Sequence, residues 1–415
     1  MEVSKDLKVF LLRLVLGVVL CGIQKSSVLA QFKSPDSSKA VIEFQNRQVF
    51  NSKNGMLHFS NAFTSARLNG FKQENDSTFK ITVTSENAPI NSSPWYAFKI
   101  WSTDRQAPSR NIVVKLNYPD TKHRYNPKVS TNGSSWTNIE QVQLNSDKSV
   151  AEFKLAVGRD TMTVSAQELI NSNDSYRWMD SLAALPFIKK NTIGYSLLGK
   201  PIIALNTIGS NGKKLIIVLS RQHPPEVTGY MAMQEFVRSL TGPSELAQKF
   251  RTKYELLLMP MLNPDGVDEG NWRHSAAGVD LNRDWEFFKQ PETRAVKDYI
   301  SAVSANQSAK VYFGIDFHST YNDVFYTNED QPDVNTNVPG FTVAWLKVFE
   351  NSIPGFKANI KPSPNGGNVS KSWMGRALGA EALTYEVGDN TSRNMLKIKG
   401  RVAAETMMKL LLDKE

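Results

Sequence analysis

Cysteine is almost absent from this 415-residue sequence, which contains a single one, Cys21. One thiol cannot form an internal disulfide, and it cannot build a site of several thiolates around a metal. Any metal that the chain binds must therefore be held by histidine and carboxylate side chains. A large core makes disulfides dispensable in any compartment, although their absence fits a bacterial periplasm better than a small extracellular domain.

Long hydrophobic runs are also missing. The longest one lies within the first 30 residues, follows two lysines, and is interrupted by Arg13. It falls short of the roughly 20 apolar residues that span a bilayer. Its end in Val28-Leu29-Ala30 is typical of a signal peptide that is cleaved. We therefore predict a signal peptide over residues 1–30 rather than a membrane anchor.

This signal leads to a prediction about location. A cleaved signal peptide indicates a secreted or periplasmic protein with no stable membrane partner beyond the signal itself. Lipid attachment at Cys21 is the lesser alternative, because Leu20 stands where a small residue usually precedes a lipidated cysteine.

Positive charge is not concentrated anywhere in the chain. The formal net charge is +9, but no block of consecutive Lys or Arg with interleaved aromatic residues occurs. The sequence therefore predicts no nucleic-acid partner, and the basic balance favours solubility or attraction to acidic substrates. Internal repeats and low-complexity segments are absent as well. We expect an ordinary globular protein that is a monomer or a small homo-oligomer.

Two kinds of secondary-structure pattern divide the mature chain. From residue 31 to 169, short alternating runs such as 79–83 and 111–116 are separated by Asn, Ser, Gly and Pro clusters. This pattern predicts an all-β sandwich domain. A polar stretch at 171–175 is interpreted as the linker to a second domain over residues 170–415.

The second domain alternates buried strands with longer helical patterns, which is typical of an α/β fold. Polar clusters stand at or just beyond the ends of these strands, where open α/β sheets form their binding crevices. Strands are expected at 214–220, 254–261, 311–317 and 382–387, and helices at 226–240, from Pro291 onward and at 394–412.

Candidate metal ligands lie at two of these strand ends. His223 and Glu226 are three residues apart where a strand ends and a helix begins, and His318 ends a later strand. Two imidazoles and one carboxylate would suit zinc and leave its fourth coordination position open. This is the arrangement of catalytic rather than structural zinc sites. Taken alone, the spacing of His223 and Glu226 is usually accidental, and His318 could merely cap its strand.

Further motifs make the set specific. The chain carries Asn-Pro-Asp-Gly-Val at 263–267, Gly-Asn-Trp-Arg at 270–273 and Gly-Val-Asp-Leu-Asn-Arg at 278–283. With the 223–226 segment these motifs resemble the zinc carboxypeptidases of the carboxypeptidase A clan, and most closely the cytosolic-carboxypeptidase branch. Ser93 to Lys99 is similar to that branch's N-terminal domain. The resemblance implies a mixed-sheet zinc carboxypeptidase domain preceded by an all-β sandwich.

The resemblance also implies a role for each motif residue. It assigns His223, Glu226 and His318 to Zn²⁺, Asn282 and Arg283 to the terminal carboxylate of a peptide or protein substrate, Arg273 to the scissile carbonyl, and Glu386 to the general base. Guanidinium groups can bind a carboxylate and can stabilise a developing oxyanion. A base whose pKa is near 7 can accept the proton of the attacking water. The ordinary alternatives are surface ion pairs for the two arginines and a structural salt bridge for Glu386.

The chain departs from the family before Glu386. The family usually has a closing tyrosine there, but residues 363–379 contain none. Lys371 lies where relatives line their side-chain pocket, and it would favour an acidic C-terminal residue; the alternative is a solvated loop lysine.

The motifs thus predict a zinc metallocarboxypeptidase, but two other hypotheses about the function remain open. One is a zinc amidohydrolase that acts on cell-wall peptides, since the same ligands serve amide hydrolysis generally. The other is a catalytically inactive binding protein. The intact set of ligands, base and arginines weighs against the second.

Overall fold

The computed structural model describes residues 42–106, 108–210, 213–329, 335–363 and 366–414. The predicted signal peptide at 1–30, and Cys21 with it, lie outside these ranges. Within them, no helix is both long and apolar enough to cross a membrane.

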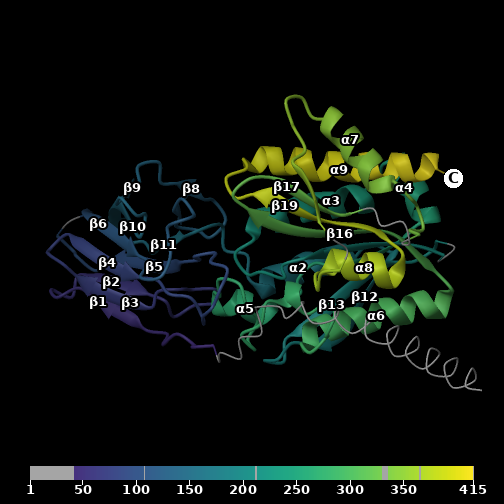
Figure 1. Cartoon of the computed structure of the whole chain (residues 1–415). Helices are drawn as coiled ribbons and strands as arrows, with labels where there is room; N and C mark the ends of the chain where they lie inside the picture. The colour runs from purple at the N-terminus through teal and green to yellow at the C-terminus, as the bar shows by residue number, and fades with distance from the viewer. Residues whose placement is uncertain (1–41, 107, 211–212, 330–334, 364–365, 415) are drawn as a thin grey trace, which may run out of the picture. The chain divides into compact units, whose positions relative to one another are not determined.

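The first part of the described chain is an all-β region of two sheets, as predicted (Figure 1). Alternate side chains of their long strands are buried, because a strand places successive residues on opposite faces. Phe59 of one sheet packs on Phe79 of the other with ring centroids 5.1 Å apart, in a core shared by both sheets. The sheets are ordered β1 (Val49–Asn51), β2 (Leu57–Ser60), β5 (Ala97–Ser102), β11 (Met162–Ser165), β7 (Lys128–Ser130), β8 (Thr137–Asn138), and β3 (Gly70–Gln73), β4 (Thr78–Thr82), β6 (Ser109–Asn117), β10 (Val150–Gly158), β9 (Gln143–Leu144).

The second part is built on an eight-stranded mixed sheet. Its central strands are parallel and almost wholly buried, which explains why they read as continuous apolar runs in the sequence. The strand order is β12 (Ile188–Tyr195), β13 (Pro201–Thr207), β15 (Glu255–Met259), β14 (Lys214–Ser220), β16 (Lys310–Thr320), β19 (Glu381–Gly388), β17 (Val324–Asn328), β18 (Ile360–Ser363). The predicted mixed-sheet α/β fold class is confirmed.

Helices cover both faces of this sheet (Figure 1). One face packs against α2 (Ser172–Ala183), α3 (Val227–Thr241), α4 (Glu245–Lys253), α7 (Phe341–Asn351) and α9 (Arg393–Asp413). The other face packs against α6 (Pro291–Gln307) and α8 (Ser370–Leu378). A short helix, α5 (Pro264–Glu269), and a 3₁₀ turn, η1 (Leu281–Arg283), lie in the long connections.

The expected linker at 171–175 is wrong, because this segment is the start of α2. The Asn171 side chain accepts a hydrogen bond from the Asp174 backbone N–H at 3.1 Å. The Asp174 carboxylate accepts one in return from the Asn171 N–H at 2.9 Å, which makes a capping box. The polar residues were therefore a helix N-terminus. The domain limits 31–169 and 170–415 stay a prediction.

Candidate metal and active site

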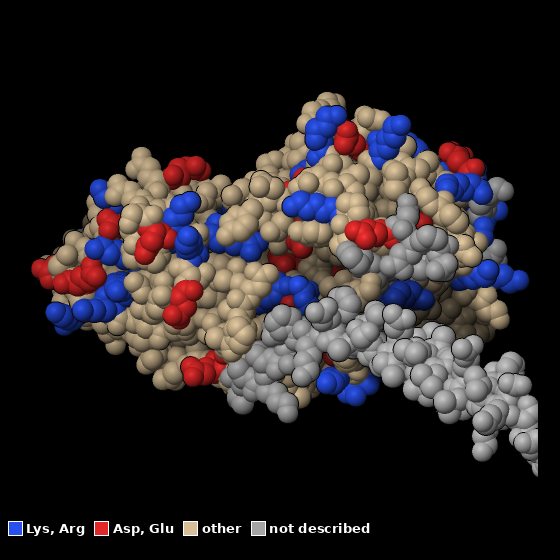
Figure 2. Space-filling view, viewed as in Figure 1, with Lys and Arg blue, Asp and Glu red and all other residues tan. Residues whose placement is uncertain are grey.

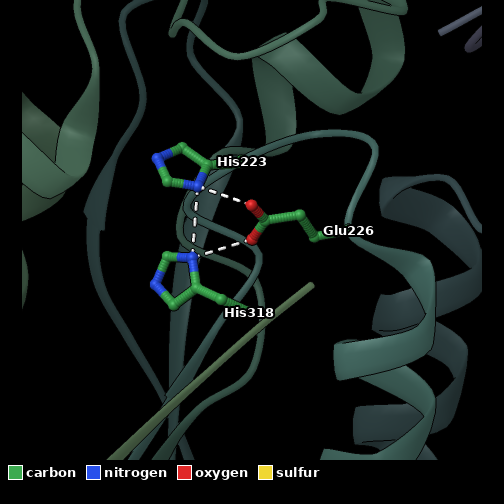
Figure 3. Close-up of side chains that lie close together, drawn as sticks. All are labelled: His223, Glu226 and His318. Carbon is green, nitrogen blue, oxygen red and sulfur yellow. Dashed lines mark hydrogen bonds and ion pairs between the residues drawn. The ribbon is translucent and has the colours of Figure 1, made fainter. Parts of the chain in front are cut away.

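Two histidines and one glutamate converge in the interior of the second part (Figure 3). Nδ1 of His223 lies 2.8 Å from Oε1 of Glu226, and Nδ1 of His318 lies 2.7 Å from Oε2 of the same carboxylate. The two Nδ1 atoms are 3.1 Å apart. All three residues are at most 3% exposed.

The backbone around the cluster explains this convergence. His223 and Glu226 lie in the connection between β14 and α3, and His318 lies near the end of β16, which is the parallel neighbour of β14. Gly229 of α3 permits the close approach of helix and strand. A Cβ at this position would come within 2.2 Å of the His318 carbonyl oxygen.

The donor set fits a zinc ion. Two nitrogens bound tetrahedrally at about 2.0–2.1 Å are expected to lie about 3.3 Å apart, close to the distance between the two Nδ1 atoms. A buried carboxylate also requires compensating positive charge. Burial alone would raise the pKa of Glu226, but the charges and hydrogen bonds of His223 and His318 outweigh that effect and lower it. A divalent cation would supply the same compensation.

Two buried aspartates hold the outer nitrogens of these histidines. Nε2 of His223 lies 2.8 Å from Asp280, and Nε2 of His318 lies 2.9 Å from Asp316. Such carboxylates fix the ring orientation and tautomer of metal-binding histidines. The sequence reasoning assigned no role to either aspartate. One signal was available, because Asp316 precedes His318 by two residues and therefore shares its face of the strand.

The candidate base, Glu386, stands beside His318. It lies on β19, directly opposite His318 of β16 in the parallel register. Its Oε2 has no hydrogen-bond partner among the described residues. Burial and the neighbouring charge of Glu226 raise the pKa of Glu386 to about 7. This carboxylate is thus close to the metal cluster without being part of it.

Arg273 is fixed from two sides. Its Nε donates to Asp280 at 2.7 Å, so one aspartate holds both this guanidinium and His223. The buried carboxylate of Glu86, in the all-β region, accepts the backbone N–H groups of Trp272, Arg273 and His274 at 2.7–3.0 Å. The sequence reasoning missed Glu86, which is far from Arg273 along the chain.

The expected substrate-binding residues lie on η1 and α8. The Asn282 side chain accepts the Ser370 N–H at 2.9 Å, and this bond joins the two elements. Arg283 keeps 37% of its side chain exposed. Lys371 is not a solvated loop residue, because it is 3% exposed in the first turn of α8 and donates to Asn328 at 2.8 Å. Burial lowers the pKa of Lys371 to about 8.

A single cavity of about 770 Å³ connects these groups. It is lined by all the predicted site residues except His318. Figure 2 shows Lys and Arg side chains at the border of a hollow near the centre of the face of the molecule that it draws. The all-β region also contributes, through residues 91–94, 120–122 and Arg124, and β17 adds Tyr326. The sequence contained no signal that these segments would reach the cavity.

Comparisons with known proteins agree with this geometry. Residues 175–340 match the zinc carboxypeptidase family. Human cytosolic carboxypeptidase 2 is 24% identical over 302 residues, which cover 65% of this chain and 34% of the relative. Mouse cytosolic carboxypeptidase 6 is 24% identical over 298 residues, which cover 64% of this chain and 54% of the relative. The chain thus matches between a third and about half of the length of these relatives.

A solved structure shares the fold. The metallo-carboxypeptidase from Burkholderia cenocepacia superposes with a TM-score of 0.71 and 19% identity, covering 86% of this chain and 98% of that one. The coverage includes most of the described residues, so the arrangement of an all-β region before the α/β region is common to both.

One prediction is wrong on these findings. The sequence reasoning expected a secreted or periplasmic protein from the pattern of residues 1–30. The curated relatives are named cytosolic carboxypeptidases, and this contradicts that location. A charged start followed by a short apolar run is a compositional signal, and such signals also arise in proteins that are not exported.

Proposed function

Because this chain carries a zinc carboxypeptidase domain over residues 175–340, we propose that it is a metallocarboxypeptidase that removes the last residue of a peptide or protein. The observation that carries this proposal is the shared cavity, which brings His223 and Glu226 of the His-Glu-His cluster together with a carboxylate outside that cluster and two arginines. The names of the relatives support the cytosol as the compartment.

In this proposal His223, Glu226 and His318 hold the zinc. When bound, the ion supplies a Lewis acid that polarises a carbonyl and lowers the pKa of water. Asp280 and Asp316 keep the two imidazoles in the tautomer that presents Nδ1 to the metal. The pairing of each outer nitrogen with a carboxylate supports these roles.

The remaining groups of the cavity complete the reaction. Glu386 accepts a proton from the attacking water and returns it to the leaving amine. Arg273 stabilises negative charge on the scissile carbonyl oxygen, and Asp280 fixes its position. Asn282 and Arg283 bind the free C-terminal carboxylate, which restricts hydrolysis to the last peptide bond. The exposure of Arg283 at the cavity supports this role.

Metal removal tests the reaction itself. The purified chain is expected to release single C-terminal residues from linear peptides, to lose this activity in a chelator, and to regain it when Zn²⁺ is added back. Peptides with an amidated C-terminus serve as the matched control, and their hydrolysis should be weak because the carboxylate contact is lost. Equal hydrolysis of free and amidated peptides, or of muropeptides alone, would contradict an exopeptidase.

Lys371 supports a preference for acidic C-terminal residues. Lys371 lines the cavity and its ammonium group is held by Asn328, so in this proposal it meets a substrate carboxylate without further ordering. Lys371→Met is expected to lower kcat/KM for C-terminal Glu peptides by about ten- to hundredfold, the worth of a charged hydrogen bond. The same change should leave C-terminal Leu peptides within a few fold.

The pH profile gives an independent readout of the same residue. A lysine whose pKa is lowered to about 8 is charged below that pH and neutral above it. The ratio of kcat/KM for Glu over Leu peptides should therefore fall as pH rises through about 8 in the wild type, and stay flat in Lys371→Met. A wild-type preference for Leu would refute the acidic specificity and leave the carboxypeptidase proposal intact.

A further inference from the structure

A second, much smaller cavity lies away from the substrate cavity. Its volume is about 10 Å³, counted as the space open to the centre of a water molecule. This is room for one small occupant. Its walls come from the all-β region and from the connections after β14 and around α5. The lining residues are Ser65, Trp95, Ile170, Arg221, Pro224, Val267, Gly270 and Asn271.

Several hydrogen-bond donors of the residues that line this cavity lack an acceptor. Arg221 is only 2% exposed, and its Nη2 donates to the Ile170 carbonyl at 3.0 Å. Its Nε and Nη1, and the hydroxyl of Ser65, have no hydrogen-bond partner among the described residues. Ser65 and Arg221 both adopt a left-handed backbone, with φ of 67° and 55°. Buried polar groups without partners in native proteins usually indicate a water or an ion.

The guanidinium of Arg221 also lacks an ion-pair partner among the described residues. It lies 5.3 Å from the centroid of the Tyr230 ring. Glu226, Asp268 and Asp174 attract its charge only from beyond ion-pair distance. The nearby carboxylates are engaged elsewhere: Glu226 with both histidines, Asp268 with Lys200, and Asp174 with Arg177. A buried charge without a counter-charge is costly, and a water molecule would satisfy the N–H groups without neutralising it.

We propose that this cavity binds one small monovalent anion, of which chloride is the most available, between the guanidinium of Arg221 and the hydroxyl of Ser65. The donors on its wall suit an anion, and its size excludes larger ones such as gluconate. The site does not depend on the proposed peptidase activity.

Occupancy would support the metal-binding segment. Arg221 and Pro224 both line the cavity, and they stand on either side of His223 in the chain. An anion that fills the cavity therefore ties the segment carrying His223 to the all-β region. Because a ligand that binds only the folded state raises its stability, chloride should stabilise the whole protein.

Thermal unfolding in matched salts tests this site. Replacing gluconate by chloride at constant ionic strength is expected to raise the Tm of the full chain by about 3 °C. Arg221→Met and Ser65→Ala should lose this dependence, whereas Arg105→Met, which removes an exposed arginine, should keep it. Both lining variants retain the metal-binding residues, so a chloride effect that arises at the metal would persist in them.

Crystals of the wild-type protein soaked in bromide give the direct measurement, and they decide the matter even if Arg221→Met does not fold. An anomalous peak within hydrogen-bond distance of Arg221 Nε or Nη1, together with the shift in Tm, supports the proposal. A water molecule in the cavity with no halide dependence of Tm overturns it. A peak without any shift in Tm means binding at crystal concentration only, and it overturns the proposal as well.

Discussion

Glu386→Gln is expected to lower kcat by about 10²–10⁴-fold, the usual contribution of a general base, while the protein retains a full complement of zinc. The amide has the size and shape of the carboxylate but cannot accept the proton of the attacking water. Glu386 lies outside the group of three ligand residues, so its replacement leaves the metal site intact. Release of C-terminal residues and metal content measure the two effects.

Two comparisons make this result specific. Glu226→Gln should lose both zinc and activity, because it removes a ligand. Thr384→Ser, on the same strand and in the same cavity, should keep activity within a few fold. A Glu386→Gln enzyme with near wild-type kcat would assign the base to another residue and return Glu386 to a structural role.

Many strands and helices of the α/β region could be predicted, because neighbouring residues in the sequence determine where they form. Residues 214–220 form a strand with the predicted bounds, and α6 starts at Pro291 as expected. Central parallel strands read as apolar runs since both of their faces are covered, and proline suits the first turn of a helix. The expected site residues other than Lys371 come together for a similar reason, since they lie in or after the carboxyl-terminal halves of parallel strands, which end at one edge of the sheet.

What could not be predicted depends on contacts between distant segments. Glu86 holds the backbone that carries Arg273, although 187 residues separate them. Nothing in the local pattern around Glu86 distinguishes it from a surface glutamate. The linker predicted at 171–175 was wrong for a different reason. Its local pattern is ambiguous, because the same polar residues occur in linkers and in helix caps. Tertiary packing decides between the two.

Arg124→Met is expected to lower the free energy of unfolding by about 3–5 kcal/mol, the range for breaking a buried ion pair from one side. Arg124, in the all-β region, binds both oxygens of Asp389 at 2.8 and 3.2 Å. Their side chains are only 6% and 3% exposed. Removing the guanidinium leaves the Asp389 carboxylate buried without its counter-charge. The midpoint of urea unfolding measures the loss.

Two further variants separate the buried charge from lost packing. Arg124→Met combined with Asp389→Leu removes both charges, and it should recover a large part of the stability because the unpaired carboxylate is gone. Lys357→Met breaks the exposed pair with Glu350, where 85% of the lysine side chain meets solvent, and it should leave the urea midpoint almost unchanged because solvent screens the pair. If Arg124→Met costs no more than Lys357→Met, the bridge contributes nothing to stability.

The bridge also bears on catalysis, because its ends lie next to the active site. Arg124 donates to the carbonyl of Ser319, the residue after His318, and Asp389 follows Glu386 by three positions. Loosening it should therefore disturb the spacing between His318, the proposed metal ligand, and Glu386, the proposed base, as well as the global stability. Arg124 also lines the cavity, so KM is measured beside kcat. A fall in kcat for Arg124→Met with KM and zinc content unchanged, measured well below its unfolding midpoint, would indicate that the all-β region helps to position this edge of the sheet. An unchanged kcat would confine the role of the bridge to stability.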